Sequence, residues 1–176
     1  MDDHAERARV KALIAQAFAG VERPGNWALV GSLEGDEPAR LAAELQDRTD
    51  WRLLDAAFLD QLPDGYGSAL SFFSDEAFRY FLPAYLIADL DGALRVVDPT
   101  FHLFHGLDDA THAEPVNPRR YGERTWLHAQ SHRFSTFTRT EAAAIVAYLR
   151  YKAAHDDFAR PQIEQAIARY WGPRAA

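Results

Sequence analysis

The longest apolar run in the chain extends from Ser74 to Leu90, and it predicts a buried central helix. Its apolar residues recur at three- and four-residue spacing and cover most of the remaining helix surface, as in helices that lie inside a domain. Ser74 can cap the first turn, because a serine oxygen accepts a hydrogen bond from an amide there. Pro83 falls in mid-helix and cannot donate to the carbonyl of Arg79, so we expect a kink. The run is too short and too interrupted by charge to span a bilayer.

Amphipathic helices are predicted before this central helix. The apolar spacing indicates a first helix over residues 3–19 and a second helix over 36–46. A third helix is expected to begin after a cap at Asp50 and to end at Pro63. In the turn-rich connection between the first two helices, Trp27 is expected to pack as an anchor for the loop.

The segments that follow the central helix are mostly short. Residues 94–97 form a small apolar run that is interpreted as one strand of a ribbon, and residues 98–106 suggest a short helix opened by Pro99. Residues 108–124 are expected to be an irregular surface loop. The C-terminal third returns to helical patterning, with a T-x-x-E capping box at Thr138 and Glu141.

The last predicted helix starts at Pro161 and is expected to stop at Gly172-Pro173. The fold class predicted from these elements is mainly α. We expect a single compact helical domain over residues 1–176, with about six or seven helices around a kinked central helix and at most one small β-ribbon.

Composition narrows the class of protein without identifying it. Apolar residues make up 48% and charged residues 26%, which is ordinary for a globular chain. The chain has no cysteine, so it has neither disulfides nor thiolate metal ligands, which fits a reducing compartment. The N-terminus carries acids and no signal-peptide pattern. A cytoplasmic location is therefore expected, with no membrane association.

The formal charge of −7 is unevenly distributed. Residues 1–118 hold 21 acids and 9 Lys or Arg, whereas residues 119–176 hold 5 acids and 10 Lys or Arg. The acidic body argues against nucleic-acid binding. The basic third forms either a surface patch or the complement of the acidic part within the fold, and the second arrangement is favoured because opposed charges within one compact domain are common.

Three fragments of the sequence together resemble a known family. They are AFAGVERPGN after the first helix, ALSFFSDEAFRYFLPAYLIADL in the middle, and FSTFTRTEAAAIVAYLRYKAAH near the end. In order and spacing they are similar to an uncharacterised bacterial family catalogued only as a domain of unknown function. Phe134, Phe137 and Thr138 match its later motif, in which Glu141 stands where glutamine is usual. The resemblance implies a fold and a bacterial source, and it supplies no activity and no catalytic residues.

The histidines form the only candidate metal site. His102 and His105 are three residues apart, and His128 and His132 are four apart, so each pair can face one side of a helix. Four such imidazoles can hold zinc tetrahedrally. The competing interpretation is ordinary packing and surface histidines, because aromatic residues flank both pairs and no thiolate assists. No cofactor is predicted.

Aromatic residues suggest a second kind of site. The 22 Phe, Trp and Tyr side chains are many for one core of this size, so some are expected to line a groove or an interface. The bend at Pro83 is a candidate pocket floor, with Tyr80 or Tyr85 supplying a polar group. The other candidates for this pocket or interface are Tyr66, Phe72, Tyr121 and Trp126. In the alternative, all of these residues line or cover the core.

Two hypotheses for function follow from these patterns. The first is a small helical module of the immunity or regulatory type, which binds a protein partner without catalysis. It is favoured because the sequence has no nucleophile elbow, no cysteine and no phosphate loop. The second is a metal-dependent hydrolase built on the four histidines.

Overall fold

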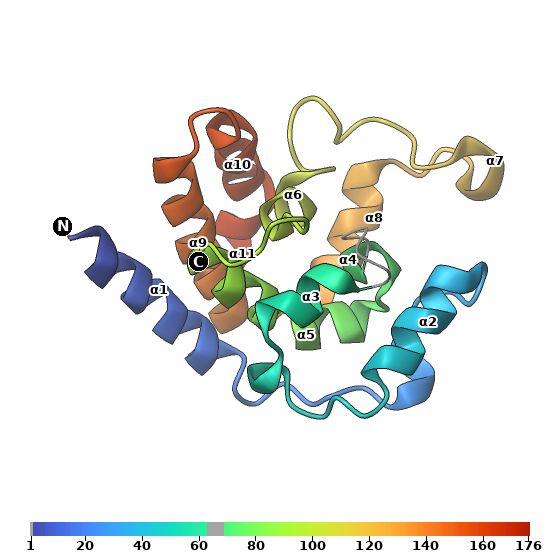
Figure 1. The fold of residues 1–176 in the computed structure, drawn as a ribbon. Helices are drawn as coiled ribbons and strands as arrows, with labels where there is room; N and C mark the ends of the chain where they lie inside the picture. The colour runs from blue at the N-terminus through green and yellow to red at the C-terminus, as the bar shows by residue number, and fades with distance from the viewer. Residues whose placement is uncertain (1, 63–68) are drawn as a thin grey trace. The chain divides into compact units, whose positions relative to one another are not determined.

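The computed structural model describes residues 2–62 and 69–176, and within these ranges the chain is mainly α with no strand (Figure 1). The predicted fold class is confirmed. Contacts divide the chain into two compact units, called unit 1 and unit 2 here. Unit 1 comprises Met1–Leu13 and Thr100–Ala176, and unit 2 comprises Ile14–Pro99. The single domain expected from the chain length stays a prediction.

Unit 2 is built around the predicted central helix, α5 (Asp75–Leu90). Ser74 caps this helix as expected, since its Oγ accepts from the amide of Ala77 at 3.0 Å and donates to the carbonyl of Ala28 at 2.6 Å. Pro83 lies inside the helix and is buried. The other elements of unit 2 are the end of α1 (Asp3–Ala17), η1 (Asn26–Ala28), α2 (Asp36–Leu45), η2 (Trp51–Leu53), α3 (Ala56–Gln61) and α4 (Ala69–Phe72).

The predicted continuous helix from Asp50 to Pro63 is wrong. Asp50 caps only the short η2, where its carboxylate accepts from the amide of Arg52. Leu54 then adopts an extended conformation, and Asp55 caps a new helix, α3, by accepting from the amide of Phe58 at 2.8 Å. Two aspartate caps five residues apart begin two separate helical segments, because each satisfies the orphan amides of its own first turn.

Residues 94–97 do not form the expected strand. Their backbone amides are held instead by one side chain, since the Asp60 carboxylate accepts from Arg95 at 2.7 Å, Val96 at 3.2 Å and Val97 at 3.1 Å. A carboxylate on α3 thus replaces the neighbouring strand that a ribbon would require. The short helices α4 and α7 (Pro118–Tyr121) were not predicted as separate elements from the sequence.

Unit 1 packs its C-terminal helices against one long helix. The predicted capping box is confirmed, because Thr138 and Glu141 cap α9 (Arg139–His155) reciprocally. Both α10 (Arg160–Ala166) and α11 (Gly172–Ala175) pack on α9. The indole of Trp171 is fully buried, 4.7 Å from the ring of Phe134. The remaining elements of unit 1 are α6 (Pro99–Phe104), α7, α8 (Trp126–Arg133) and η3 (Phe134–Thr136).

The last helix does not stop at Gly172-Pro173 as predicted. A π-helical turn, η4 (Ile167–Trp171), carries the chain on into α11. The amide of Gly172 donates to the carbonyl of Ile167, and a Cβ at this glycine would lie 2.8 Å from that carbonyl oxygen. Pro173 then falls in the first turn of α11, where its missing N–H is not needed.

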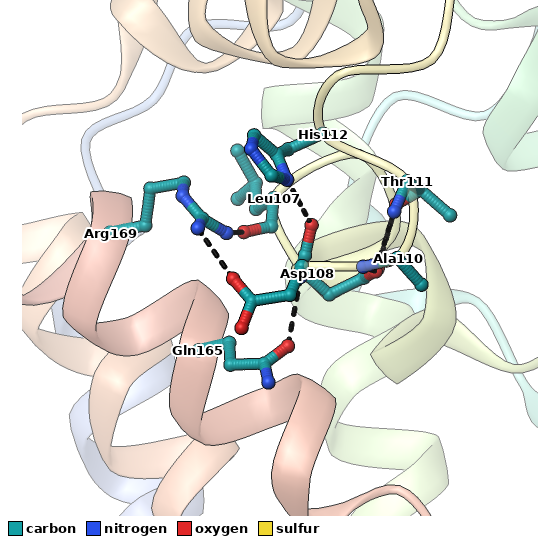
Figure 2. A network of polar contacts seen from close by, with 8 residues as sticks. Leu107, Asp108, Ala110, Thr111, His112, Gln165 and Arg169 are labelled. Atoms are coloured by element: carbon teal, nitrogen blue, oxygen red, sulfur yellow. Dashed lines mark hydrogen bonds and ion pairs between the residues drawn. The ribbon is translucent and has the colours of Figure 1, made fainter.

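The segment 108–124 is not uniformly an irregular surface loop. Asp108 is buried, and its carboxylate accepts from the amides of Ala110 and Thr111 at 2.9 Å each and from Thr111 Oγ1 at 2.8 Å. Figure 2 shows how two residues from the C-terminal helices hold this turn. Arg169 donates to the carbonyl of Leu107 and to Asp109 Oδ1, and Gln165 Oε1 accepts from the amide of Asp109. These contacts give the network a structural role.

Candidate functional site

The four candidate metal ligands all lie in unit 1. His102 is on α6 and His105 directly follows it, whereas His128 and His132 are on α8. Across the described ranges, the structure contains no group of three or more His, Cys, Asp or Glu side chains placed to share a metal ion. The histidines are therefore not gathered into the tetrahedral set that the sequence suggested, and the metal hypothesis rests on spacing alone.

His105 takes part in an aromatic stack. Its imidazole lies parallel to the ring of Phe101 at 4.8 Å and edge-on to Trp126 at 4.7 Å. Burial lowers the pKa of His105, against the opposing charges of Asp108 and Glu114. Burial, with smaller contributions from Arg133 and His105, also lowers the pKa of His102 to about 4. Both imidazoles are thus neutral at pH 7, as expected of packed side chains.

The predicted pocket and interface residues occupy different parts of the chain. In unit 2, Tyr85 and Pro83 are buried and Phe72 is half-buried, while the hydroxyl of Tyr80 donates to the carbonyl of Thr49 at 2.7 Å. In unit 1, Trp126 belongs to the His105 stack. Tyr121 is exposed, with guanidinium groups over its ring. Tyr66 lies outside the described residues.

A cavity of about 460 Å³ opens along the second half of α5. The α5 residues that line it, Ala84, Ile87, Ala88 and Asp91, follow the i, i+3, i+4, i+7 spacing of one helix face and begin directly after Pro83. We call this space the α5 cavity. Its other lining residues come from α1, η2, α3 and the segments that flank them: Ala15, Trp51, Arg52, Leu54, Asp55, Ala56 and Ala93.

The α5 cavity has mostly apolar walls and a few polar groups. Trp51 is almost fully buried, and within the described part of the chain its indole N–H has no acceptor. The guanidinium of Arg52 lies 5.2 Å from the Trp51 ring and pairs with Asp50 at 3.1 Å. Asp55 and Asp91 add two carboxylates. This combination of apolar surface and sparse polar groups is typical of a binding site.

A second feature of unit 2 is an exposed tryptophan on a fixed loop. Trp27 is 90% exposed, so its predicted role as a packing anchor is wrong. The loop around it is anchored by Arg23, whose guanidinium satisfies the carbonyls at the end of α2, where a cation is also favoured by the helix dipole. The acceptors lie at 2.8 to 3.2 Å and are the carbonyls of Pro24, Leu45, Gln46 and Arg48 and Oδ1 of Asn26.

Gly25 allows this loop to fold closely on itself. A Cβ at Gly25 would lie 2.6 Å from Nε1 of Trp27, so a larger residue at this position would displace the indole. Neither the α5 cavity nor the exposure of Trp27 was predicted from the sequence. One signal for the cavity was the pair of small residues, Ala84 and Ala88, on an otherwise bulky helix. One signal for the loop was Arg23 followed by Pro24 and Gly25, within a fragment that carries the family resemblance.

The comparison with protein families confirms the resemblance seen in the sequence. The model of a family of unknown function, DUF6714, matches residues 6–175, so the chain belongs to this family. No curated protein and no solved structure matches the chain. None of the helices in the described ranges is long and apolar enough to cross a bilayer.

Proposed function

We propose that this chain is a non-catalytic binding protein, of the immunity or regulatory type, that docks a basic protein partner on unit 2. Charge supports this proposal. Residues 14–99 carry 15 acids and 6 Lys or Arg, a net charge of −9, whereas the rest of the chain carries 11 acids and 13 Lys or Arg, a net charge of +2. A surface with one dominant sign accelerates encounter with a partner of the opposite sign and selects against partners of the same sign.

The observation that carries the proposal is the exposure of Trp27. A tryptophan that leaves most of its ring in water loses the stabilisation that burial would provide, and tryptophan is enriched among the residues that dominate binding energy. The Arg23 contacts fix the loop before any partner arrives, which lowers the entropy lost on docking. Leu33 and Leu53 add exposed apolar surface in the same unit.

Affinity capture with a matched control tests the proposal. Tagged wild-type chain is compared with Trp27→Ala and with Phe158→Ala in lysate of the organism that encodes it. Phe158 is the control because it is 88% exposed and lies in unit 1. We expect a basic protein that is retained by wild type and Phe158→Ala and lost with Trp27→Ala. Equal retention by both variants, or no specific retention by wild type, contradicts the proposal.

Neither substitution should change the fold, because both side chains project into solvent. The free energy of unfolding of each variant is expected to stay within about 0.5 kcal/mol of wild type. Denaturant melts of the three proteins therefore show whether a lost partner reflects lost contacts or lost structure.

A further inference from the structure

The α5 cavity combines three chemical features, and each specifies part of an occupant. Its walls are dominated by small and aliphatic side chains, including Ala84, Ile87, Ala88 and Leu54. Small side chains on a buried helix leave the space open, and apolar walls favour an apolar group that displaces water from them. The first requirement is therefore an aliphatic or aromatic side chain.

The second feature is the indole N–H of Trp51. It is buried in a residue that lines the cavity and has no acceptor among the described residues. Buried donors in folded proteins are nearly always paired, and an unpaired one needs an explanation. The nitrogen is closed to solvent, so a backbone carbonyl of a docked segment provides the acceptor only when the indole turns toward the cavity. The need for such a polar acceptor favours a peptide over a purely apolar ligand.

The third feature is charge. Two carboxylates, Asp55 and Asp91, and one guanidinium, that of Arg52, stand among the described residues that line the cavity. The carboxylates thus exceed the cations at the cavity, within a unit of net charge −9. A lysine or arginine beside the apolar side chain of the occupant would complement this excess.

We infer that the α5 cavity binds a segment of a basic partner protein in which an apolar side chain is flanked by lysine or arginine. The inference rests on the proposed function and adds to it the chemistry of the partner. The apolar side chain fills the space along α5, a backbone carbonyl of the segment accepts from Trp51 Nε1, and the flanking cation lies at Asp55 and Asp91.

A titration followed by nuclear magnetic resonance tests this inference without a known partner. The probes are acetyl-Lys-Phe-Leu-Lys-amide and its acidic counterpart, acetyl-Glu-Phe-Leu-Glu-amide. The chain has four tryptophans, so Trp51→Phe identifies the indole N–H signal of Trp51. We expect the basic peptide to shift this signal saturably and the acidic peptide to leave it in place.

Two variants locate the binding. Ala88→Leu narrows the cavity and should weaken the basic peptide about tenfold or more, because added methyl groups occupy the space it needs. Ala42→Leu, at a half-buried alanine of α2 outside the cavity, is the control and should bind as wild type does. Asp91→Asn should weaken binding less, about two- to fivefold, because one of the two carboxylates remains.

The inference is overturned if the Trp51 signal does not move at about 10 mM basic peptide, a concentration at which even millimolar affinity is visible. It is also overturned if both peptides shift the signal equally, or if Ala88→Leu binds like Ala42→Leu. A partner that is lost with Trp27→Ala but retained by Ala88→Leu refutes the cavity alone. A cavity-specific titration without any captured partner refutes the proposed function alone.

Discussion

Removal of the phenolic hydroxyl group should have opposite effects on stability at two buried tyrosines, Tyr85 and Tyr148. The hydroxyl of Tyr85 on α5 is buried and has no hydrogen-bond partner within residues 2–62 and 69–176. Burial raises the pKa of this phenol well above its usual range, and the nearby charge of Asp60 adds to the effect, so the group remains a protonated donor. A buried polar group without a partner costs about 1–3 kcal/mol. Tyr85→Phe should therefore raise the free energy of unfolding by about 1 kcal/mol.

The hydroxyl of Tyr148 on α9 is equally buried but paired. It lies 2.7 Å from Oγ1 of Thr100, which is itself buried. Tyr148→Phe removes this bond and leaves the threonine hydroxyl without that partner. The expected result is a loss of about 1–2 kcal/mol in the free energy of unfolding.

Urea melts of the two variants and wild type, followed by circular dichroism, measure both changes. If the free energy of unfolding falls with urea concentration at the same slope in all three proteins, the changes in midpoint reflect stability rather than a changed unfolded state. A loss of more than about 1 kcal/mol for Tyr85→Phe would mean that this hydroxyl has a partner in the folded protein, and the description of the α5 surroundings would be wrong. A neutral Tyr148→Phe would show that the bond to Thr100 contributes nothing.

Three further predictions concern other contacts. Asp60→Ala should lower the free energy of unfolding by about 2 kcal/mol in urea melts, because three backbone amides of residues 95–97 lose their acceptor. Pro83→Ala should lower it by about 1–2 kcal/mol, since the surrounding core packs against a helix that contains proline, and a higher melting temperature would refute this. The third is a pH effect of His102, whose folded pKa is about 4 and whose ordinary pKa is 6.5. As the pH falls, His102 takes up a proton in the unfolded chain before it does so in the folded protein. The free energy of unfolding is therefore unaffected by this residue above pH 6.5 and decreases by up to about 3 kcal/mol toward pH 4. Urea melts should show a steeper loss in this window for wild type than for His102→Gln.

The parts of the fold that the sequence predicted correctly are those specified by neighbouring residues. The cap at Ser74 and the reciprocal cap of Thr138 and Glu141 each involve residues within one helical turn, so their spacing reveals them. The core character of α5 follows from its own apolar periodicity.

The errors arose where distant contacts override local pattern. The chain at residues 94–97 has the apolar composition of a strand, but the carboxylate of Asp60 holds its amides. Trp27 is a large aromatic residue in a loop, and such a residue usually anchors the loop by packing. Here Arg23 holds the loop through a carbonyl of α2, and the indole of Trp27 lies in solvent. Such contacts join residues more than 20 positions apart, and sequence spacing does not encode them.

None of the residues proposed from the sequence for a pocket is among the described residues that line the α5 cavity, and whether they form a site stays a prediction. The bend at Pro83 was expected to form the floor of a pocket, and the α5 cavity begins at the next residue, Ala84. Its opposite wall was missed because η2 and α3 were read as one helix, which would have placed Trp51 and Ala56 on a continuous surface. The break at Leu54 separates η2 from α3, and residues of both segments line the cavity.

Site-specific photo-cross-linking in living cells tests the central claim most directly, namely that unit 2 docks a basic protein partner. Benzoylphenylalanine is placed at position 27 in one version of the chain and at position 158 in another, and adducts are identified by mass spectrometry. Binding through the Trp27 loop predicts a discrete covalent adduct with a basic protein from position 27 and none of that adduct from position 158. The same adduct from both positions, or none from position 27, would contradict the claim.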